Sequence, residues 1–169
     1  MKIAVIGATG LVGSVMCEEL DRILSGCYEL LVAASERSVG REIVFRGERL
    51  RVQSIEAVLA ARPDVALFAA GSTVSLAYAE RFASMGIYVV DNSSAWRMHA
   101  GVPLVVPEIN PEALTPEAHI IANPNCSTIQ MVMVLAPLHR VYRLRRLHVS
   151  TYQSVSGSGM KGIAQLRSE

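Results

Sequence analysis

The residues best suited to chemistry surround one cysteine, in the string Asn-Pro-Asn-Cys-Ser-Thr at 123–128. Pro124 disfavours helix at the residue before it, Asn125 is a good N-cap, and the residues after Thr128 have the apolar pattern of a helix. Cys126 is therefore predicted to lie in the first turn of a helix, where the partial positive charge of the helix end favours the thiolate. Since the thiolate is the nucleophilic form, this position favours covalent acyl chemistry.

The other two cysteines have no such setting. Cys17 belongs to a predicted helix, and Cys27 follows a glycine between a helix and a strand, so both are interpreted as packing residues. Packing is also the alternative for Cys126, because most cysteines are small buried hydrophobes. Three cysteines without paired spacing suit a reducing compartment, and we expect the cytoplasm.

A glycine-rich loop, Gly-Ala-Thr-Gly-Leu-Val-Gly at 7–13, follows the first apolar segment of the chain. Glycines allow a tight turn and let the backbone approach a pyrophosphate, and the helix that follows offers free N–H groups. The spacing is G-x-x-G-x-x-G rather than G-x-G-x-x-G, so a strand–helix turn that only needs small residues is the alternative. The place of the loop after a strand favours nucleotide binding.

The end of the second predicted strand, at 34–40, bears on which nucleotide is bound. An acidic side chain there holds the ribose 2′-hydroxyl of NAD, whereas hydroxyl groups and an arginine suit the 2′-phosphate of NADP. Ser35, Arg37 and Ser38 therefore favour NADP, and Glu36 is the contrary evidence. We predict NADP.

Alternating strands and helices must position these residues. Strands are predicted at 2–6, 29–34, 64–69, 87–90, 119–122 and 146–153, a hairpin at 41–53, and helices after the glycine loop, at 55–61, at 73–85 and for about a dozen residues from Cys126. The alternation predicts an α/β fold with a Rossmann-like, doubly wound, mainly parallel sheet. The loops at the carboxyl ends of its strands are then expected to carry the site.

Composition excludes several classes of function. The chain has 169 residues, of which 51% are hydrophobic and 18% charged, as in folded globular domains. Its 16 basic and 15 acidic residues give a net charge of +1, so a nucleic-acid partner is not expected. No apolar run approaches the ~20 residues that a bilayer requires, so no membrane partner is expected either.

Several strings together resemble the aspartate-semialdehyde dehydrogenase family. They are the glycine loop at 7–13, Asp-Asn-Ser-Ser-Ala-Trp-Arg-Met at 91–98, Pro-Leu-Val-Val-Pro-Glu-Ile-Asn at 103–110, Asn-Pro-Asn-Cys-Ser-Thr-Ile-Gln-Met at 123–131 and Thr-Tyr-Gln at 151–153. The resemblance implies NADP-dependent, reversible conversion of L-aspartyl 4-phosphate to L-aspartate 4-semialdehyde with release of inorganic phosphate. It further implies a homodimer and a place in lysine, threonine, methionine and diaminopimelate biosynthesis.

The resemblance also implies roles for single residues. Cys126 would form an acyl thioester, Gln153 would contact the substrate beside it, and Arg97 and Asn125 would bind the substrate and its phosphate with Gln153. The cofactor contacts would be Gly7, Thr9, Gly10, Leu11, Val12, Gly13, Ser35, Arg37, Ser38, Gly71, Ser72, Ser156 and Gly157. No metal is implied.

The resemblance divides the chain into an NADP-binding domain at 1–125 and the beginning of a truncated catalytic domain at 126–169. The family's proton-transfer histidine and a substrate-binding arginine would lie beyond residue 169, so the chain alone is expected to be inactive. His148 is no substitute, because it has opposite parity to Gln153 on the predicted strand 146–153. His99, His119 and His139 are expected to be packed or solvated.

Two other interpretations stay open. An enzyme like N-acetylglutamyl-phosphate reductase shares the reaction type and the spacing of the glycines, although the cysteine string fits the aspartate enzyme better. The chain could also be a non-catalytic NADP-binding fragment.

Overall fold

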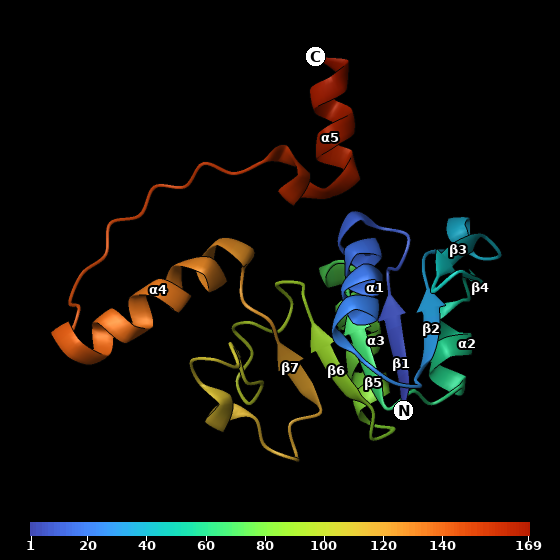
Figure 1. Cartoon of the computed structure of the whole chain (residues 1–169), viewed down its shortest axis with the longest axis horizontal. Coiled ribbons are helices and arrows are strands. Elements are labelled where there is room, and N and C mark those ends of the chain that lie inside the picture. The colour runs from blue at the N-terminus through green and yellow to red at the C-terminus, as the bar shows by residue number, and fades with distance from the viewer.

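A parallel five-stranded sheet forms the body of the protein in the computed structural model, which describes residues 1–169 (Figure 1). In spatial order the strands are β2 (Glu29–Ala33), β1 (Lys2–Ile6), β5 (Val65–Phe68), β6 (Tyr88–Asp91) and β7 (Ile120–Ala122). Each neighbouring pair is parallel. Five predicted strands are thus confirmed, within one or two residues at their ends.

The register brings the last residue of every strand into one row. The row across the sheet is Ala33, Ile6, Phe68, Asp91 and Ala122, and all five residues are buried. Because the strands are parallel, the loops that follow these residues all leave the sheet at the same edge.

Helices cover both faces of the sheet, as a doubly wound fold requires (Figure 1). Side chains of α2 (Ile55–Ala60) and α3 (Ser72–Ala83) pack with Ala4 and Ile6 on one face, and α1 (Leu11–Ile23) packs with Ile3 and Val5 on the other. Successive residues of a strand point to opposite faces, so the continuous apolar run of β1 is what a strand covered on both sides needs. The predicted Rossmann-like fold is confirmed.

The predicted hairpin is also present, as the antiparallel pair β3 (Glu42–Phe45) and β4 (Glu48–Arg51). Just after it, Gln53 forms a parallel bridge with Ala33 at the outer edge of β2. The chain therefore winds outward from β1 to β2 and this bridge, then returns to β5 on the other side of β1. The sheet reverses its winding between β1 and β5, where doubly wound folds bind nucleotides.

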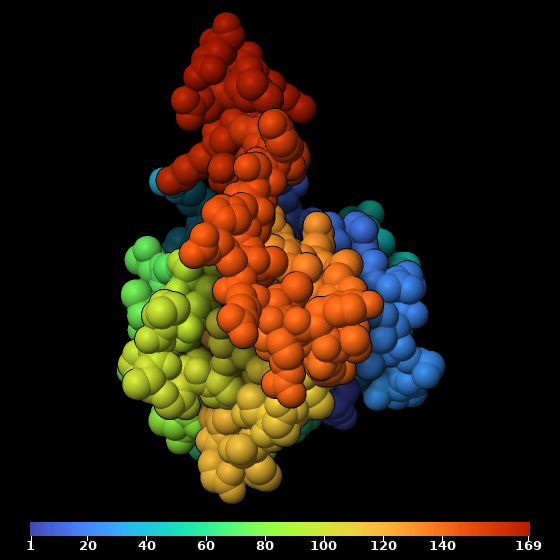
Figure 2. All heavy atoms as spheres, turned by 90° about the vertical axis from the view of Figure 1, so that its left-hand side faces the viewer, coloured from blue at the N-terminus to red at the C-terminus, as the bar shows by residue number.

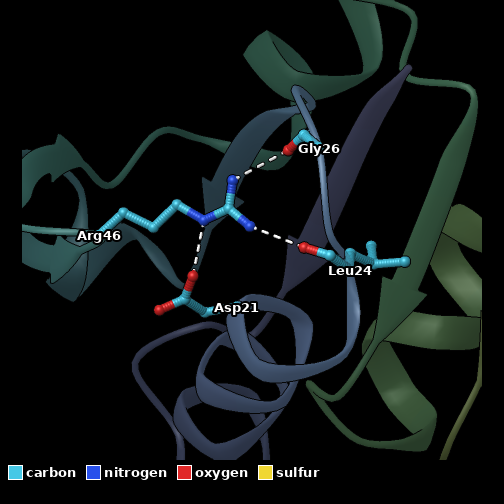
Figure 3. Close-up of polar contacts among 4 residues, drawn as sticks. All are labelled: Asp21, Leu24, Gly26 and Arg46. Atoms are coloured by element: carbon cyan, nitrogen blue, oxygen red, sulfur yellow. Dashed lines mark hydrogen bonds and ion pairs between the residues drawn. The ribbon is translucent and has the colours of Figure 1, made fainter.

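Arg46, at the turn of the hairpin, fastens the hairpin to the end of α1 (Figure 3). Its Nε donates to Oδ1 of Asp21 at 2.6 Å, and its two terminal nitrogens donate to the carbonyls of Leu24 and Gly26. The guanidinium also lies 4.6 Å from the centre of the Tyr28 ring. These contacts hold the hairpin beside the first helix, next to the segment that follows β2.

The remaining elements lie outside the body. Helix α4 (Cys126–Tyr142) leaves the edge of the sheet after β7, and α5 (Gly159–Ser168) projects beyond the body at the end of a long connection (Figures 1 and 2). Neither helix has a buried residue. None of the helices combines the length and the apolar character needed to cross a bilayer. Short 3₁₀ turns occur at Glu36–Ser38, Pro111–Ala113 and Val155–Ser158.

Two predictions about this region are wrong. The segment 146–153 is not a strand, and the physical reason is that no other strand lies beside it to pair with its backbone. The argument that His148 and Gln153 face opposite ways on that strand therefore loses its basis. The helix that begins at Cys126 has 17 residues rather than about a dozen, because it continues through Pro137.

Close approach of α1 to the glycine loop depends on Gly13. A Cβ built on Gly13 would lie 2.1 Å from the carbonyl oxygen of Gly7, well inside contact distance. Gly7 has a φ of +96°, and a Cβ there would lie 2.8 Å from the carbonyl carbon of Ala69. The two glycines let the loop, the helix and the end of β5 meet.

We predict that Gly13→Ala lowers the free energy of unfolding by about 1–3 kcal/mol, because the methyl group forces the helix away from the loop. Urea denaturation followed by circular dichroism measures the change. Gly157→Ala is the matched control, since Gly157 has open space around its Cβ position and no positive φ. Equal stability of the Gly13→Ala and wild-type chains would contradict the prediction.

Candidate functional site

The chemistry-bearing residues follow the row of strand ends. Gly7, Asn92 and Asn123 come directly after β1, β6 and β7, while Ser35 and Gly71 follow β2 and β5 after one and two further residues. One edge of the sheet therefore carries the glycine loop, the predicted 2′-phosphate segment and the loop that leads to Cys126.

The glycine loop turns the chain tightly between β1 and α1. The amides of Gly7 and Ala8 both donate to the carbonyl of Ala33, and the amide of Gly10 donates to the carbonyl of Gly7 at 2.9 Å. Gly10 is the N-cap of α1 and, having no side chain, leaves the first turn without a side-chain cap. Backbone N–H groups at such a helix end form a ready site for an anion.

Contact between Thr9 and Ser38 joins this loop to the end of β2. The Thr9 hydroxyl donates to the Ser38 hydroxyl at 3.3 Å, and Ser38 is buried. Ser35 and Arg37 are exposed beside it, and Arg37 takes part in no ion pair. The structure thus brings the predicted 2′-phosphate residues next to the predicted pyrophosphate loop, with Arg37 and the adjacent Glu36 both exposed and outside the ion pairs of the chain.

Gly71 and Ser72 stand at the beginning of α3. Gly71 has a φ of +86° and is the N-cap of that helix. The Ser72 hydroxyl lies 3.1 Å from the hydroxyl of Ser94, which belongs to the loop after β6. Ser72 therefore contacts the loop that also carries Arg97.

Cys126 is the first residue of α4, as predicted, and it is exposed. Oδ1 of Asn125 accepts a hydrogen bond from the amide of Ser127 at 3.0 Å, which caps the helix. Nε2 of Gln153 donates to the Cys126 sulfur over 3.9 Å. Gln153 reaches the sulfur from the extended connection rather than from the strand that the sequence pattern indicated.

A shallow cavity of about 300 Å³ surrounds the sulfur. Its lining is Cys126, Ser127, Gln130, Tyr152, Gln153, Ser154, Ser156 and Gly157. The structure therefore gathers four of the predicted site residues, two from the substrate group and two from the cofactor group. Gln130, which also lines the cavity, was not predicted, although its place one turn after Cys126 on the same helix could have indicated it.

Arg97 is fixed beside the loop that leads to the cysteine. Its Nε donates to the carbonyl of Asn123 at 2.9 Å, and its Nη2 donates to the carbonyl of Asn92 at 3.1 Å. Both partners are neutral, and Arg97 takes part in none of the ion pairs of the chain. A half-buried guanidinium without a carboxylate partner is suited to binding an anion.

Hydrogen bonds connect the loop that carries Arg97 to β6 and to α3. The buried Asp91 accepts a hydrogen bond from the Ser93 hydroxyl at 2.6 Å, and Ser93 in turn accepts one from the amide of Ala95. The indole N–H of the buried Trp96 donates to Ser75 of α3 at 2.9 Å. These bonds tie the loop to β6 and to α3 and so help to hold Arg97 at the edge of the sheet.

The histidines and the other cysteines lie away from the sulfur. None of the four histidines lines the cavity at Cys126. Cys17 is buried, and burial together with the neighbouring Glu18 raises the pKa of its thiol to about 11. Cys27 is exposed.

Comparison with known protein families gives a match over most of the chain. The family model described as semialdehyde dehydrogenase, NAD binding domain, matches residues 2–116. This chain belongs to the semialdehyde dehydrogenase family. A second model, semialdehyde dehydrogenase, dimerisation domain, matches residues 135–169. The boundary predicted between residues 125 and 126 falls in the interval between the two matches.

Individual proteins similar to this semialdehyde dehydrogenase chain are named aspartate-semialdehyde dehydrogenase. Aspartate-semialdehyde dehydrogenase of Aquifex aeolicus is 45% identical over 171 residues, which cover 99% of the chain and 50% of the relative. The crystal structure of aspartate semialdehyde dehydrogenase II of Vibrio cholerae, complexed with ASA, is similar with a TM-score of 0.92 and 44% identity, over 99% of this chain and 50% of that one. The chain spans about half the length of the curated relatives it matches.

A more distant similarity is to the crystal structure of aspartate semialdehyde dehydrogenase from Candida albicans with NADP. Its TM-score is 0.70 and its identity 26%, over 82% of this chain and 46% of that one.

The three thiols of this family member should differ sharply in reactivity. At pH 8, three pH units below the pKa of Cys17, we expect an aromatic disulfide reagent to titrate only Cys27 and Cys126 in the folded chain. The third thiol should appear after denaturation, or as the pH rises toward 11. Absorbance at 412 nm counts the thiols released. Three thiols reacting at equal rates in the folded chain would contradict the burial of Cys17.

Proposed function

We propose that this chain is the cofactor-binding and nucleophile-bearing part of an aspartate-semialdehyde dehydrogenase. The observation that carries the proposal is one arrangement: Cys126 at a helix N-terminus, Gln153 on its sulfur, and the free charge of Arg97 on the loop before it. The relatives named aspartate-semialdehyde dehydrogenase support the choice of substrate over that of N-acetylglutamyl-phosphate reductase.

In the proposed reaction the Cys126 thiolate attacks the acyl carbon of L-aspartyl 4-phosphate. The bond from that carbon to the phosphate oxygen breaks, and inorganic phosphate leaves with the electron pair. Arg97, with the side chain of Asn125 beside the cysteine, would hold this anion. The amide of Gln153 would orient the acyl group that remains on sulfur.

A thioester accepts hydride more readily than a carboxylate, so the covalent step lowers the barrier to reduction. The residues at the strand ends fit a dinucleotide, because the glycine loop at Gly7 and Gly13 has no room for a Cβ and the first turn of α1 has no side-chain cap. When bound, NADPH would supply the hydride. Ser156 and Gly157, which line the cavity at the sulfur, would contact its nicotinamide end. Loss of the sulfur from the reduced carbon then releases the aldehyde and restores the thiolate.

The preference for NADP over NAD is part of the proposal. Arg37 and Ser35 are exposed beside the Thr9–Ser38 contact, and a 2′-phosphate needs positive charge and hydrogen-bond donors at this place. The NADP in the Candida albicans relative supports the same preference.

We predict that Arg37→Ala weakens NADPH binding about 10- to 100-fold, the effect of losing a charge-assisted hydrogen bond. NADH binding should stay unchanged, because NADH has no 2′-phosphate. Fluorescence titration of both nucleotides measures the two affinities. Arg41→Ala removes a second exposed arginine four residues along the chain and serves as the control. A parallel loss of NADPH and NADH binding in Arg37→Ala would argue against the contact.

We predict that the chain, mixed with L-aspartate semialdehyde and NADP but no phosphate, gives a burst of NADPH no larger than the chain concentration. An acyl adduct on Cys126 should accompany it. A single turnover is the right test, because a loss of acid–base assistance would slow it by ~10²–10⁴-fold without changing its end point. Absorbance at 340 nm follows the burst, and peptide mass spectrometry locates the adduct.

Two serine variants give the controls for this experiment. Cys126→Ser should abolish both the burst and the adduct, and Cys27→Ser, at the other exposed cysteine, should keep both. An undiminished burst in Cys126→Ser would refute the covalent mechanism. Binding of NADP with neither burst nor adduct would instead favour a non-catalytic NADP-binding fragment.

We also propose that the whole protein is a cytoplasmic homodimer. The match of residues 135–169 to a dimerisation domain supports the dimer, and α4 carries exposed apolar side chains suited to an interface. They are Met133, Val134, Leu138, Val141 and Tyr142. The three free cysteines suit a reducing compartment.

A further inference from the structure

Two asparagines occupy equivalent places after neighbouring strands. Asn92 directly follows β6, and Asn123 directly follows β7. Nδ2 of Asn123 donates to Oδ1 of Asn92 over 2.6 Å, so the two side chains form a bridge between the strand ends. The amide of Asn123 also donates to the carbonyl of Asp91 at 2.8 Å, which fixes the two backbones beside each other.

The guanidinium of Arg97 spans the same two residues on their main-chain side. Its Nε bonds the carbonyl of Asn123, and its Nη2 bonds the carbonyl of Asn92. The amide bridge thus joins the side chains of the two residues whose carbonyls one planar guanidinium must reach at once, and it adds to the backbone bond between Asn123 and Asp91. Only Pro124 and Asn125 separate Asn123 from Cys126, so the same bridge ties Arg97 to the beginning of α4.

We infer that Asn92 and Asn123 are positioning residues that act through each other to hold Arg97 against the loop carrying Cys126. An arginine side chain loses much rotamer freedom when it is fixed, and fixing it before the anion arrives lowers the cost of binding the anion. The inference rests on the proposed function, because it concerns the anion site that Arg97 would form.

A double-mutant cycle tests this coupling. All variants carry Cys27→Ser, so that alkylation by iodoacetamide reports on Cys126 while Cys17 stays buried. The alkylation rate is measured against the concentration of inorganic phosphate at constant ionic strength, which gives the concentration for half-maximal protection. The proteins compared are the Cys27→Ser parent, Asn92→Ala, Asn123→Ala and the double variant.

We expect each single substitution to raise the half-protecting phosphate concentration about 3- to 10-fold, the effect of losing one hydrogen bond. The double variant should need no more phosphate for half-maximal protection than the more strongly affected single variant, because both substitutions break the same bridge. NADPH affinity and the midpoint of thermal unfolding should change little, whereas a merely structural role would alter both. Tyr88→Phe, which removes the bond to the Pro116 carbonyl from the opposite end of β6, should leave protection unchanged.

The outcomes separate this inference from the function it rests on. A parent thiol that phosphate does not protect would overturn the anion site and the inference together. Suppose that phosphate protects the parent but that the single substitutions leave the half-protecting concentration unchanged, or that their effects multiply in the double variant. Either result would overturn the inference alone. Asn92→Ser and Asn123→Ser form a second cycle in case an alanine variant fails to fold.

Discussion

Alignment of five strand ends is the constraint on which the rest of this structure depends. Ala33, Ile6, Phe68, Asp91 and Ala122 are the last residues of their strands and lie in one row across the sheet. A slip of one residue in any strand would turn its buried side chains to the other face, so the apolar packing on both faces enforces the register. Because the register holds, segments more than a hundred residues apart in sequence, such as those that begin at Gly7 and Asn123, leave the sheet at one edge.

Small residues then allow helix α1 and the glycine loop to approach each other closely at that edge. α1 can rest on the glycine loop because Gly13 brings no Cβ against the Gly7 carbonyl. Thr9 of the same loop lies within hydrogen-bond distance of Ser38, which joins the loop after β1 to the loop after β2. In the proposed function this edge would hold the phosphates of a dinucleotide by backbone more than by side chains.

At the other end of the row of strand ends, hydrogen bonds between polar side chains join the neighbouring loops. Asp91 is a carboxylate in an otherwise apolar row, and its bond from Ser93 helps to meet the cost of burying it. The Asn92–Asn123 pair and Arg97 then connect the loop after β6 with the loop before Cys126. The charge of Arg97 stays available because its protein partners are neutral carbonyls.

Much of this arrangement follows from the sequence itself. The continuous apolar run at 2–6, the glycines at 7–13 and the Pro-Asn-Cys order before α4 each specify a local conformation, because they act through backbone sterics and near neighbours. Strands, helix starts and the place of Cys126 at a helix end could therefore be predicted, as could the mainly parallel sheet that their alternation requires.

Contacts between distant segments could not be predicted in the same way. Gln153 meets the Cys126 sulfur from an extended connection, and the apolar alternation at 146–153 forms no strand because a strand exists only where another backbone pairs with it. The Asn92–Asn123 bridge and the hydrogen bonds of Arg97 to two carbonyls likewise depend on the pairing of β6 with β7. The sequence by itself determined the elements of the parallel sheet and the place of Cys126. The tertiary structure decided which polar groups meet, because hydrogen bonds between strand ends need the register of the whole sheet.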